Sequence, residues 1–561
     1  MPDADGACGD VHEPSEPERP VEGRLKRAWS ASGRIHEAVV IIVVYLAAHG
    51  LVLLNGGLFW DDWAMFRLPR AQFAELLWQT GGSTWPPEFY TWIYASRSSV
   101  WAARAVSAAL LLVAFLAFNA ILRRIPALSR QDRLLTVIVA ATFPVFSARV
   151  PLIDATYIIS LSLFMIGWWL ADAWVESRRP WLALAACALF FASFRTQSLG
   201  FFYLLVLFFL LYRQSDSTRS LHANVLDFVR TSWMYVIPPV AYLVVKVLLP
   251  APSGTYQGYN QLTPGSLASA LWTTPTTGLI ESFFKPVWLA LTSLGILAAV
   301  AFALLVLVIA PRQRASVMRV RVGLASFGVG CMAFFLGVLP YVAVGKVPVL
   351  TGFESRHQLL VPFGAAVMLV SAVRLALGRF RHGEWMGLAV ILVFVAGSIS
   401  ADIGSTLSYY REMYKTDSFL LHVREQPEFK SGTAFMIDDR TPELNVSGRG
   451  PMRFYEYSGM FASVFDEETR FGADEAGWRA FEELERASRA RGASYLSRQY
   501  KLGGYVVRKP QYVVTITRGS LNVSRNDTVI RLAWLQLTNH AAFEQVVERA
   551  VDVRVSPYPA P

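Results

Sequence analysis

The chain has 561 residues, of which 54% are hydrophobic and only 17% are charged, and its mean hydropathy is +0.37. This composition excludes an ordinary soluble enzyme and predicts a polytopic membrane protein. The net charge of +10 does not indicate a nucleic-acid partner, because the basic residues lie in short tracts between apolar segments rather than along one helix face. The three cysteines offer neither a disulfide framework nor a thiolate metal site.

Residues 1–36 are rich in proline and charged residues, lack an apolar core and carry no cleavage signal. We therefore expect a disordered cytoplasmic tail. Apolar segments of roughly 17 to 24 residues, long enough to span a bilayer, follow. They begin near residues 37, 101, 134, 155, 287, 322, 358 and 386, with a shorter one near 232. Residues 181–212 are too long for one straight span and are interrupted by Ser193–Ser198.

Arginine-rich loops decide how often the chain crosses the membrane. They hold Arg123 to Arg133, Arg178 and Arg179, Arg213 to Arg230, Arg312 to Arg321, and Arg379 and Arg381. Loops rich in arginine stay in the cytoplasm, and all of these fall on one side only if residues 181–212 cross twice. We expect about eleven transmembrane helices in the inner (plasma) membrane, with a cytoplasmic N-terminus and an external C-terminus.

After residue 406 the long apolar runs end and the charge density rises. Residues 478–491 have a helical pattern, whereas residues 512–517 alternate as a strand does. The fold class we predict is a mainly α membrane protein. A transmembrane domain spans residues 37–406, and an extracytoplasmic α/β domain spans residues 407–561, which is long enough to fold independently.

The run Phe59-Trp60-Asp61-Asp62-Trp63 follows the first apolar segment. Tryptophan favours the membrane boundary, so the rings would hold both acids at the water interface. Asp61 and Asp62 are candidates for a general base and an assisting acid, because neighbouring like charges raise one pKa towards neutrality. The alternative is a helix N-cap or a solvated turn.

Cations also gather on the predicted external face. Arg149, Arg195, Arg356 and His357 are candidates for binding the phosphate of a donor substrate. The alternative for each is a side chain that extends from a helix end towards water, and Glu354 can simply pair with Arg356. Candidates for other substrate contacts on this face are Trp63, Glu88, Asp154 and Glu354.

The acidic pair in the form Phe-x-Asp-Asp-Trp after the first helix resembles the GT-C superfamily of glycosyltransferases, which use polyprenyl-phosphate-linked sugars. Further similarity lies in Trp101-Ala102-Ala103-Arg104, Phe194-Arg195-Thr196-Gln197 and Arg356-His357-Gln358-Leu359-Leu360-Val361-Pro362. The resemblance covers residues 37–406. Many members have Asp-Glu in place of Asp61-Asp62, and a lysine often stands where this chain has Arg195.

The resemblance implies that Asp61 is the catalytic carboxylate, which acts as the general base, and that Asp62 assists. It also implies that Arg195, Arg356 and His357 hold the phosphate. The partners would be a polyprenyl-phosphate-linked sugar, membrane lipid, and a glycan, lipid or protein acceptor, with inversion at the anomeric carbon. Some members use a divalent cation, Mg²⁺ or Mn²⁺, for which only Asp61 and Asp62 are candidate ligands. Transfer from a sugar phosphate needs one base and fixed cations, since the departing phosphate is a weak base.

Two alternatives belong to other classes. One is an O-antigen-type polymerase or ligase that acts on a diphosphate-linked glycan, although such enzymes usually concentrate function in one large late loop. The other is a lipid or solute transporter that is not an enzyme. Transporters tend to carry inverted repeats and charges near the bilayer midplane, whereas the centres of these apolar segments are almost uncharged.

Overall fold

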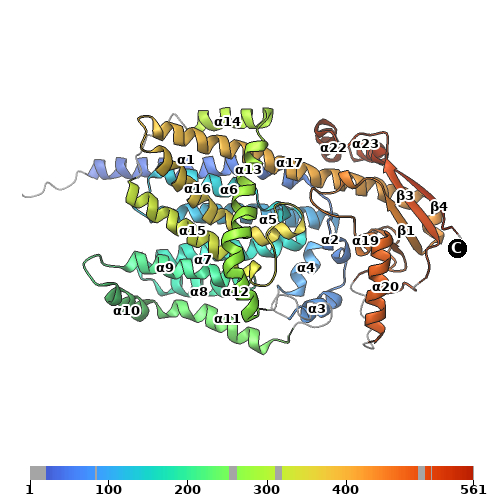
Figure 1. Cartoon of the computed structure of the whole chain (residues 1–561), viewed down its shortest axis with the longest axis horizontal. Helices are drawn as coiled ribbons and strands as arrows, with labels where there is room; N and C mark the ends of the chain where they lie inside the picture. The colour runs from blue at the N-terminus through green and yellow to red at the C-terminus, as the bar shows by residue number, and fades with distance from the viewer. Residues whose placement is uncertain are drawn as a thin grey trace, which may run out of the picture.

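The computed structural model describes residues 20–81, 85–251, 262–309, 319–490, 500–506 and 508–559. The protein is mainly α-helical, as predicted. Its apolar helices form one bundle, and a small β-sheet lies beyond one end of that bundle (Figure 1). Three short helices of the first long loop, α2 (Asp61–Met65), α3 (Arg70–Gln79) and α4 (Pro87–Ile93), lie at the same end, between the bundle and the C-terminal helices (Figure 1).

Six segments among the described residues are long and apolar enough to cross a membrane. Three of them are single helices, namely α5 (Arg97–Leu122), α15 (Val320–Val342) and α17 (Gly383–Glu425). The segment Ile35–Leu54 contains the end of α1 (Pro20–His49) and the turn η1 (Gly50–Leu54), and Leu152–Ser177 contains the turn η3 (Leu152–Asp154) and α7 (Ala155–Ser177). The segment Leu221–Leu248 contains α10 (Leu221–Ser232) and α11 (Ile237–Leu248). A further pair, Pro264–Thr292 and Ile296–Leu307, is bent by 98° and gives a seventh span if it is counted as one. This pair contains α12 (Pro264–Thr273), α13 (Lys285–Thr292) and part of α14 (Ile296–Ile309).

The other helices of the bundle are shorter. They are α6 (Arg130–Thr142), α8 (Pro180–Ser193), α9 (Ser198–Gln214) and α16 (Val361–Leu377). Two of them, α8 and α9, are the pair expected from the interrupted region 181–212. A hydrocarbon core about 30 Å thick needs about 20 helical residues, so the predicted count of about eleven crossings stays a prediction.

Helix α1 begins earlier than expected. Residues 20–36 were predicted to belong to the disordered tail, but α1 begins at Pro20. The sequence from Arg24 to Ala31 contains Arg, Leu, Lys and Ala, which are good helix formers, and the following apolar segment extends the same helix. The prediction for residues 1–19 lies outside the described residues.

Ion pairs join arginine-rich loops at the end of the bundle far from the sheet. Arg123, after α5, lies 2.8 Å from Glu37 of α1. Arg124 and Arg213 each lie 2.9 Å from Asp172 near the end of α7. The loops that follow α5 and α9 therefore lie at one end of the bundle, and α2 to α4 lie at the other (Figure 1). Two of the five arginine-rich tracts therefore lie at one end of the bundle, whereas the predicted topology requires this of all five.

The C-terminal region combines helices with a four-stranded sheet of order β2-β1-β3-β4. The strands are β1 (Ala434–Asp439), β2 (Phe471–Ala473), β3 (Tyr512–Arg518) and β4 (Val551–Pro557), of which only the β3 and β4 pair is antiparallel. The helices are α18 (Pro427–Ser431), α19 (Phe454–Phe465), α20 (Glu475–Ala490), α22 (Asn526–Thr538) and α23 (His540–Val547). The strand expected at 512–517 is β3, and the helix expected at 478–491 is α20.

Helix α17 connects the bundle to this region without a break. The predicted domain boundary at residue 406 falls inside this helix of 43 residues. One hydrophobic cluster joins Trp63 of α2 to Tyr410 of α17, Phe435 of β1 and Val514 of β3. The C-terminal region thus shares its core with the first long loop, whereas its length alone led us to expect independent folding.

Candidate active site

The loop that carries both acids is fixed by a buried arginine. Arg104 of α5 is 1% exposed. It donates hydrogen bonds to the carbonyl oxygens of Asn55, Gly57 (2.8 Å) and Val150 (2.9 Å). A guanidinium that donates to three backbone carbonyls joins the loop before α2 to the turn before α7. At the end of this loop Trp60 has φ of +48° and ψ of −121°, a strained conformation for a residue with a side chain.

Asp62 is a fully buried structural acid. Its Oδ1 accepts hydrogen bonds from the Tyr94 hydroxyl (2.7 Å) and from the backbone N–H groups of Leu152 and Ile153 (3.1 Å each). Its Oδ2 accepts one from the N–H of Phe59 at 3.2 Å. Burial raises the pKa of Asp62 to about 6, although these hydrogen bonds and Arg104 favour the charged form. Because both oxygens are occupied by the protein, Asp62 holds α2 against the turn before α7.

Asp61 has a different environment, since it is only partly buried. Tyr455 of α19 and Arg356 of a neighbouring turn both act on its carboxylate and favour its charged form. The pKa of Asp61 is raised, chiefly by burial, which the interaction with Tyr455 opposes. The prediction of a raised pKa therefore agrees with the structure, but the main cause is burial rather than the adjacent carboxylate. Of the two acids, Asp61 is the one that can accept a proton from a substrate.

The turn η9 (Phe353–Gln358) supplies a cation that acts on Asp61. Arg356 is 7% exposed, and its guanidinium carbon lies 3.7 Å from the centre of the Phe353 ring. Its Nη2 lies 3.4 Å from Glu354 Oε1, and its Nε donates to His357 Nε2 at 3.3 Å. Burial, Arg356 and Lys346 lower the pKa of His357 to about 3. His357 is therefore a neutral imidazole at physiological pH, and Arg356 carries the charge of this turn.

Asp154 lies at the start of the span that contains α7 and is completely buried. Neither of its carboxylate oxygens has a hydrogen-bond partner among the described residues. The charged groups that influence it include Arg356, Asp61 and Asp62. A buried carboxyl without a partner is uncommon, and its position beside Asp61 and Arg356 makes it part of the same site.

Arg195 lies between α8 and α9, with its guanidinium carbon 5.1 Å from the centre of the Trp85 ring. It also acts electrostatically on Tyr90 of α4, which interacts with Thr156 and Tyr157 at the start of α7 as well. Since these two residues closely follow Asp154, Arg195 lies near the segment that carries this acid. The structure thus groups Asp61, Asp154 and Arg356, with Arg195 and Trp85 at the margin.

Three predicted residues do not join this group. Arg149 lies 2.5 Å from Asp402 of α17 and contacts His49, so its charge is already paired within the bundle. Glu88 is exposed and pairs with Arg70 at 2.5 Å. Trp63 is 2% exposed and lies beneath α19. A tryptophan buried in this way contributes to the core rather than to an open substrate surface.

No sequence pattern indicated the residues that α19 and its preceding loop bring to the site. The Arg449 side chain lies between Glu412 and Glu456, 2.5 Å from the latter, and its guanidinium carbon lies 5.2 Å from the centre of the Trp60 ring. Tyr455 favours the charged form of Asp61. Their segment has neither a recognisable motif nor an unusual composition, so only the tertiary structure identifies them.

The described residues contain no group of three or more His, Cys, Asp and Glu side chains that could hold a metal ion. The carboxylates of Asp61 and Asp62 also have different surroundings, because backbone N–H groups bind Asp62, whereas Tyr455 and Arg356 act on Asp61. A divalent cation at this pair stays a prediction.

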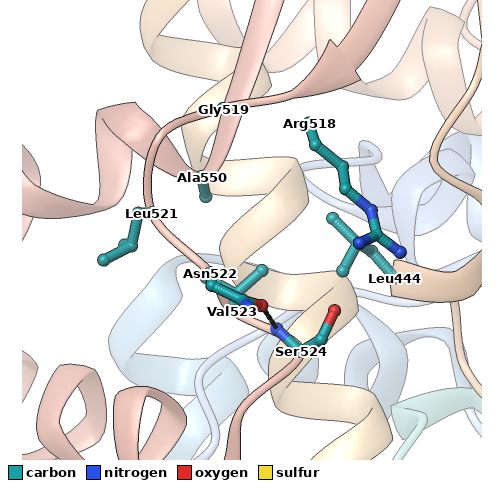
Figure 2. Close-up of a pocket in the computed structure, with 8 residues that line it drawn as sticks. All are labelled: Leu444, Arg518, Gly519, Leu521, Asn522, Val523, Ser524 and Ala550. Atoms are coloured by element: carbon teal, nitrogen blue, oxygen red, sulfur yellow. Dashed lines mark hydrogen bonds between the residues drawn. The ribbon is translucent and has the colours of Figure 1, made fainter.

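A separate hollow lies in the C-terminal region, and Figure 2 shows the residues that line it. They are Leu444, Arg518, Gly519, Leu521, Asn522, Val523, Ser524 and Ala550. Within it Asn522 Oδ1 accepts a hydrogen bond from the backbone N–H of Ser524 at 3.1 Å (Figure 2). The hollow shares no lining residue with the surroundings of Asp61, so we do not assign it to the candidate active site.

A scan of the chain against protein-family models finds no match, and a search of curated proteins finds no significantly similar sequence.

Proposed function

We propose that the protein is a membrane glycosyltransferase of the GT-C type, which moves a sugar from a polyprenyl-phosphate donor to an extracytoplasmic glycan, lipid or protein acceptor. The observation that carries this proposal is that the segment of Asp61, a partly exposed acid, packs against the turn that holds the buried cation of Arg356, with the Trp60 and Phe353 ring centres 5.4 Å apart. These residues are far apart in the sequence and meet at one end of a bundle of membrane-length helices.

The proposed reaction is a single displacement with inversion. The acceptor hydroxyl attacks the anomeric carbon while the Asp61 carboxylate takes its proton, which requires Asp61 to be charged before the step. The bond between the anomeric carbon and the phosphate oxygen breaks, and the electron pair stays with the phosphate. Arg356 stabilises the charge that develops there, because a buried guanidinium can donate two hydrogen bonds to phosphate.

Other residues of the site would bind substrate. Arg195, over Trp85, is suited to contact a more peripheral part of the donor, because it combines a cation with an aromatic surface. Asp154 could accept a hydrogen bond from a sugar hydroxyl, since its oxygens have no protein partner among the described residues. Glu354, whose side chain is 48% exposed, would orient Arg356. The proposal puts this site outside the cytoplasm, in the inner membrane.

The test uses the purified full-length protein with a synthetic polyprenyl-phosphate sugar, and the release of polyprenyl phosphate is measured. Asp61→Asn keeps the shape of the side chain but cannot accept the proton, so turnover should fall by about 10² to 10⁴ while donor binding persists. Glu75→Gln is the matched control, because Glu75 is an exposed acid of the same loop. Near-normal turnover of Asp61→Asn would reject Asp61 as the base.

A further inference from the structure

We propose that α22 is an interfacial helix, which lies on the membrane surface and inserts one apolar face, formed by Ile530, Trp534 and Leu537, between the lipid headgroups. The inference requires that the bundle spans a membrane, but it does not depend on the chemistry proposed for Asp61. It assigns the C-terminal region a lipid contact that the proposed function does not require.

Helix α22 exposes most of the large apolar side chains that remain uncovered in its region. In the described part of the chain after α17, such side chains are exposed at Val506, Ile530, Trp534, Leu537 and Tyr558. The three on α22 have exposed fractions of 58%, 67% and 53%. Residues three and four positions apart lie on one face of a helix, so these three side chains form a continuous strip. Single exposed apolar residues are common, whereas a contiguous strip indicates an interaction surface.

The opposite face of α22 is already packed against the protein. Val529 and Leu532 are buried and belong to the same hydrophobic cluster as Tyr410 of α17 and Val514 of β3. The exposed strip is therefore not the face that holds α22 in place, and the fold of the C-terminal region does not account for it.

Polar residues border the strip along the side away from the packed face. They are Asp527, Arg531 and Thr538, and all three are exposed. Asp527 is paired with Arg525 at 2.8 Å. A guanidinium such as that of Arg531 suits lipid phosphates, and tryptophan favours the headgroup region. An apolar strip with a polar, partly basic border is the pattern of a helix that lies in a membrane interface.

The first residue of α22 is level with the end of a membrane-length segment. The Tyr410 hydroxyl of α17 donates to the carbonyl oxygen of Leu51 at 2.8 Å, within the apolar segment that ends at Leu54. The adjacent Arg411 donates to the side-chain oxygen of Asn526, the first residue of α22, at 2.7 Å. Since Tyr410 and Arg411 are neighbours on one helix, Asn526 lies close to the depth at which this apolar segment ends.

The later part of α22 lies close to the same boundary. A Cβ atom on Gly56, two residues after Leu54, would be 3.8 Å from the side-chain nitrogen of Gln536. Both parts of the helix are thus near the end of the apolar segment, and α22 runs along this boundary rather than away from it. Figure 1 shows α22 beside α17, near the end of the bundle.

Lipid fits this strip better than a second copy of the chain does. Val43 and Leu46 of α1 are exposed within the apolar segment that ends beside α22, as is expected where lipid surrounds the bundle. A stable protein interface typically buries roughly 800 Å² on each partner, which is more than three side chains on one short helix provide. The lipid surface, in contrast, is continuous with the surroundings of the bundle.

The experiment uses the full-length protein in vesicles of phosphatidylethanolamine and phosphatidylglycerol. The three native cysteines are replaced, and a nitroxide is attached to Ile530→Cys or Leu537→Cys, with Thr538→Cys as the matched control on the polar border. Electron paramagnetic resonance measures collisions of each label with oxygen, which concentrates in lipid, and with a nickel chelate, which stays in water. We expect the labels at 530 and 537 to lie about 5 to 10 Å below the phosphate level and the label at 538 to lie above it.

Thermal unfolding in detergent shows that each labelled variant is folded, and Trp534→Cys offers another label position on the strip. If the labels at 530 and 537 collide with the nickel chelate as often as the label at 538 does, the strip faces water and the proposal is overturned. If they are shielded from both reagents and labels on different molecules broaden one another's spectra, a second copy of the chain covers the strip, which overturns the lipid contact as well.

Discussion

The guanidinium of Arg149 lies 2.5 Å from the carboxylate of Asp402, and both side chains are buried. This pair joins the turn η2 (Ser147–Arg149) to α17, and His49 of α1 contacts the same guanidinium at 2.7 Å. Charges within a membrane bundle are usually paired in this way. Arg149 was a candidate for phosphate binding, but its charge is already paired with Asp402 and does not face a substrate site.

Loss of one member of this pair should destabilise the protein. Arg149→Met leaves Asp402 buried without its counter-ion, and such a change typically costs about 3 to 5 kcal/mol. The double variant Arg149→Met with Asp402→Leu should regain most of the lost stability, because it removes both charges. Thermal unfolding in detergent measures this. A single variant with normal unfolding and weaker donor binding would instead support a substrate-binding role for Arg149.

The buried Asp62 should make stability depend on pH. Its pKa is raised to about 6 in the folded protein, compared with about 3.9 in an unfolded chain. Between these values the folded state binds more protons, so the stability from Asp62 is present below pH 4 and is lost as the pH rises through 6, with an upper limit of about 3 kcal/mol. Asp62→Asn should be less stable overall but should have a flatter dependence between pH 4 and 6. An unchanged slope would contradict the raised pKa.

Donor binding should hardly depend on pH near neutrality. The pKa of His357 is lowered to about 3, so its charge does not change between pH 5.5 and 8, whereas arginine stays charged throughout. Affinity for a non-hydrolysable polyprenyl-phosphate sugar should be constant in this range and should fall at least tenfold in Arg356→Gln. If His357 were the binding cation, affinity would decrease as the pH rises through about 6.5.

Asp61 and Arg356 could be selected as candidates from the sequence, because each lies in a short polar run beside an apolar segment. The arginine-rich loops then indicate which ends of the apolar segments lie on the same side of the membrane. The sequence could not reveal the partner of Arg149, since Asp402 is an isolated acid in an apolar segment far along the chain. Tyr455 was missed because its influence on Asp61 arises from the packing of α19 against α2, where Gly459 lies close to Trp63, and no local pattern encodes this packing.

The domain boundary shows a related limit. Composition changes near residue 407 because α17 emerges from the apolar bundle, not because the helix ends. Hydropathy reports the surroundings of a helix and not its continuity, so the change of composition gave a boundary that falls inside α17. Apolar helices were easier to predict, since hydropathy and length determine them directly.

The orientation in the membrane gives a further prediction. Because the loops that follow α5 and α9 meet at the end opposite α2 to α4, the arginine distribution implies that the C-terminal region is external. A periplasmic reporter such as alkaline phosphatase, fused after residue 561, should be active, whereas the same reporter fused after Arg178 should be inactive. The opposite pattern would put Asp61 in the cytoplasm and contradict the proposed site.

The C-terminal region should not be stable by itself. In the whole chain the Tyr410 hydroxyl donates to the carbonyl oxygen of Leu51 at 2.8 Å, and the Tyr409 ring packs edge-on against Phe59 with ring centres 5.0 Å apart. A fragment of residues 407–561 would expose these aromatic surfaces, and large exposed apolar patches promote aggregation. We expect the fragment to bind a hydrophobic dye strongly and to aggregate, and we expect co-expression with residues 1–406 to suppress both effects. A soluble monomeric fragment with cooperative unfolding and little dye binding would show that the shared core is not needed for its folding.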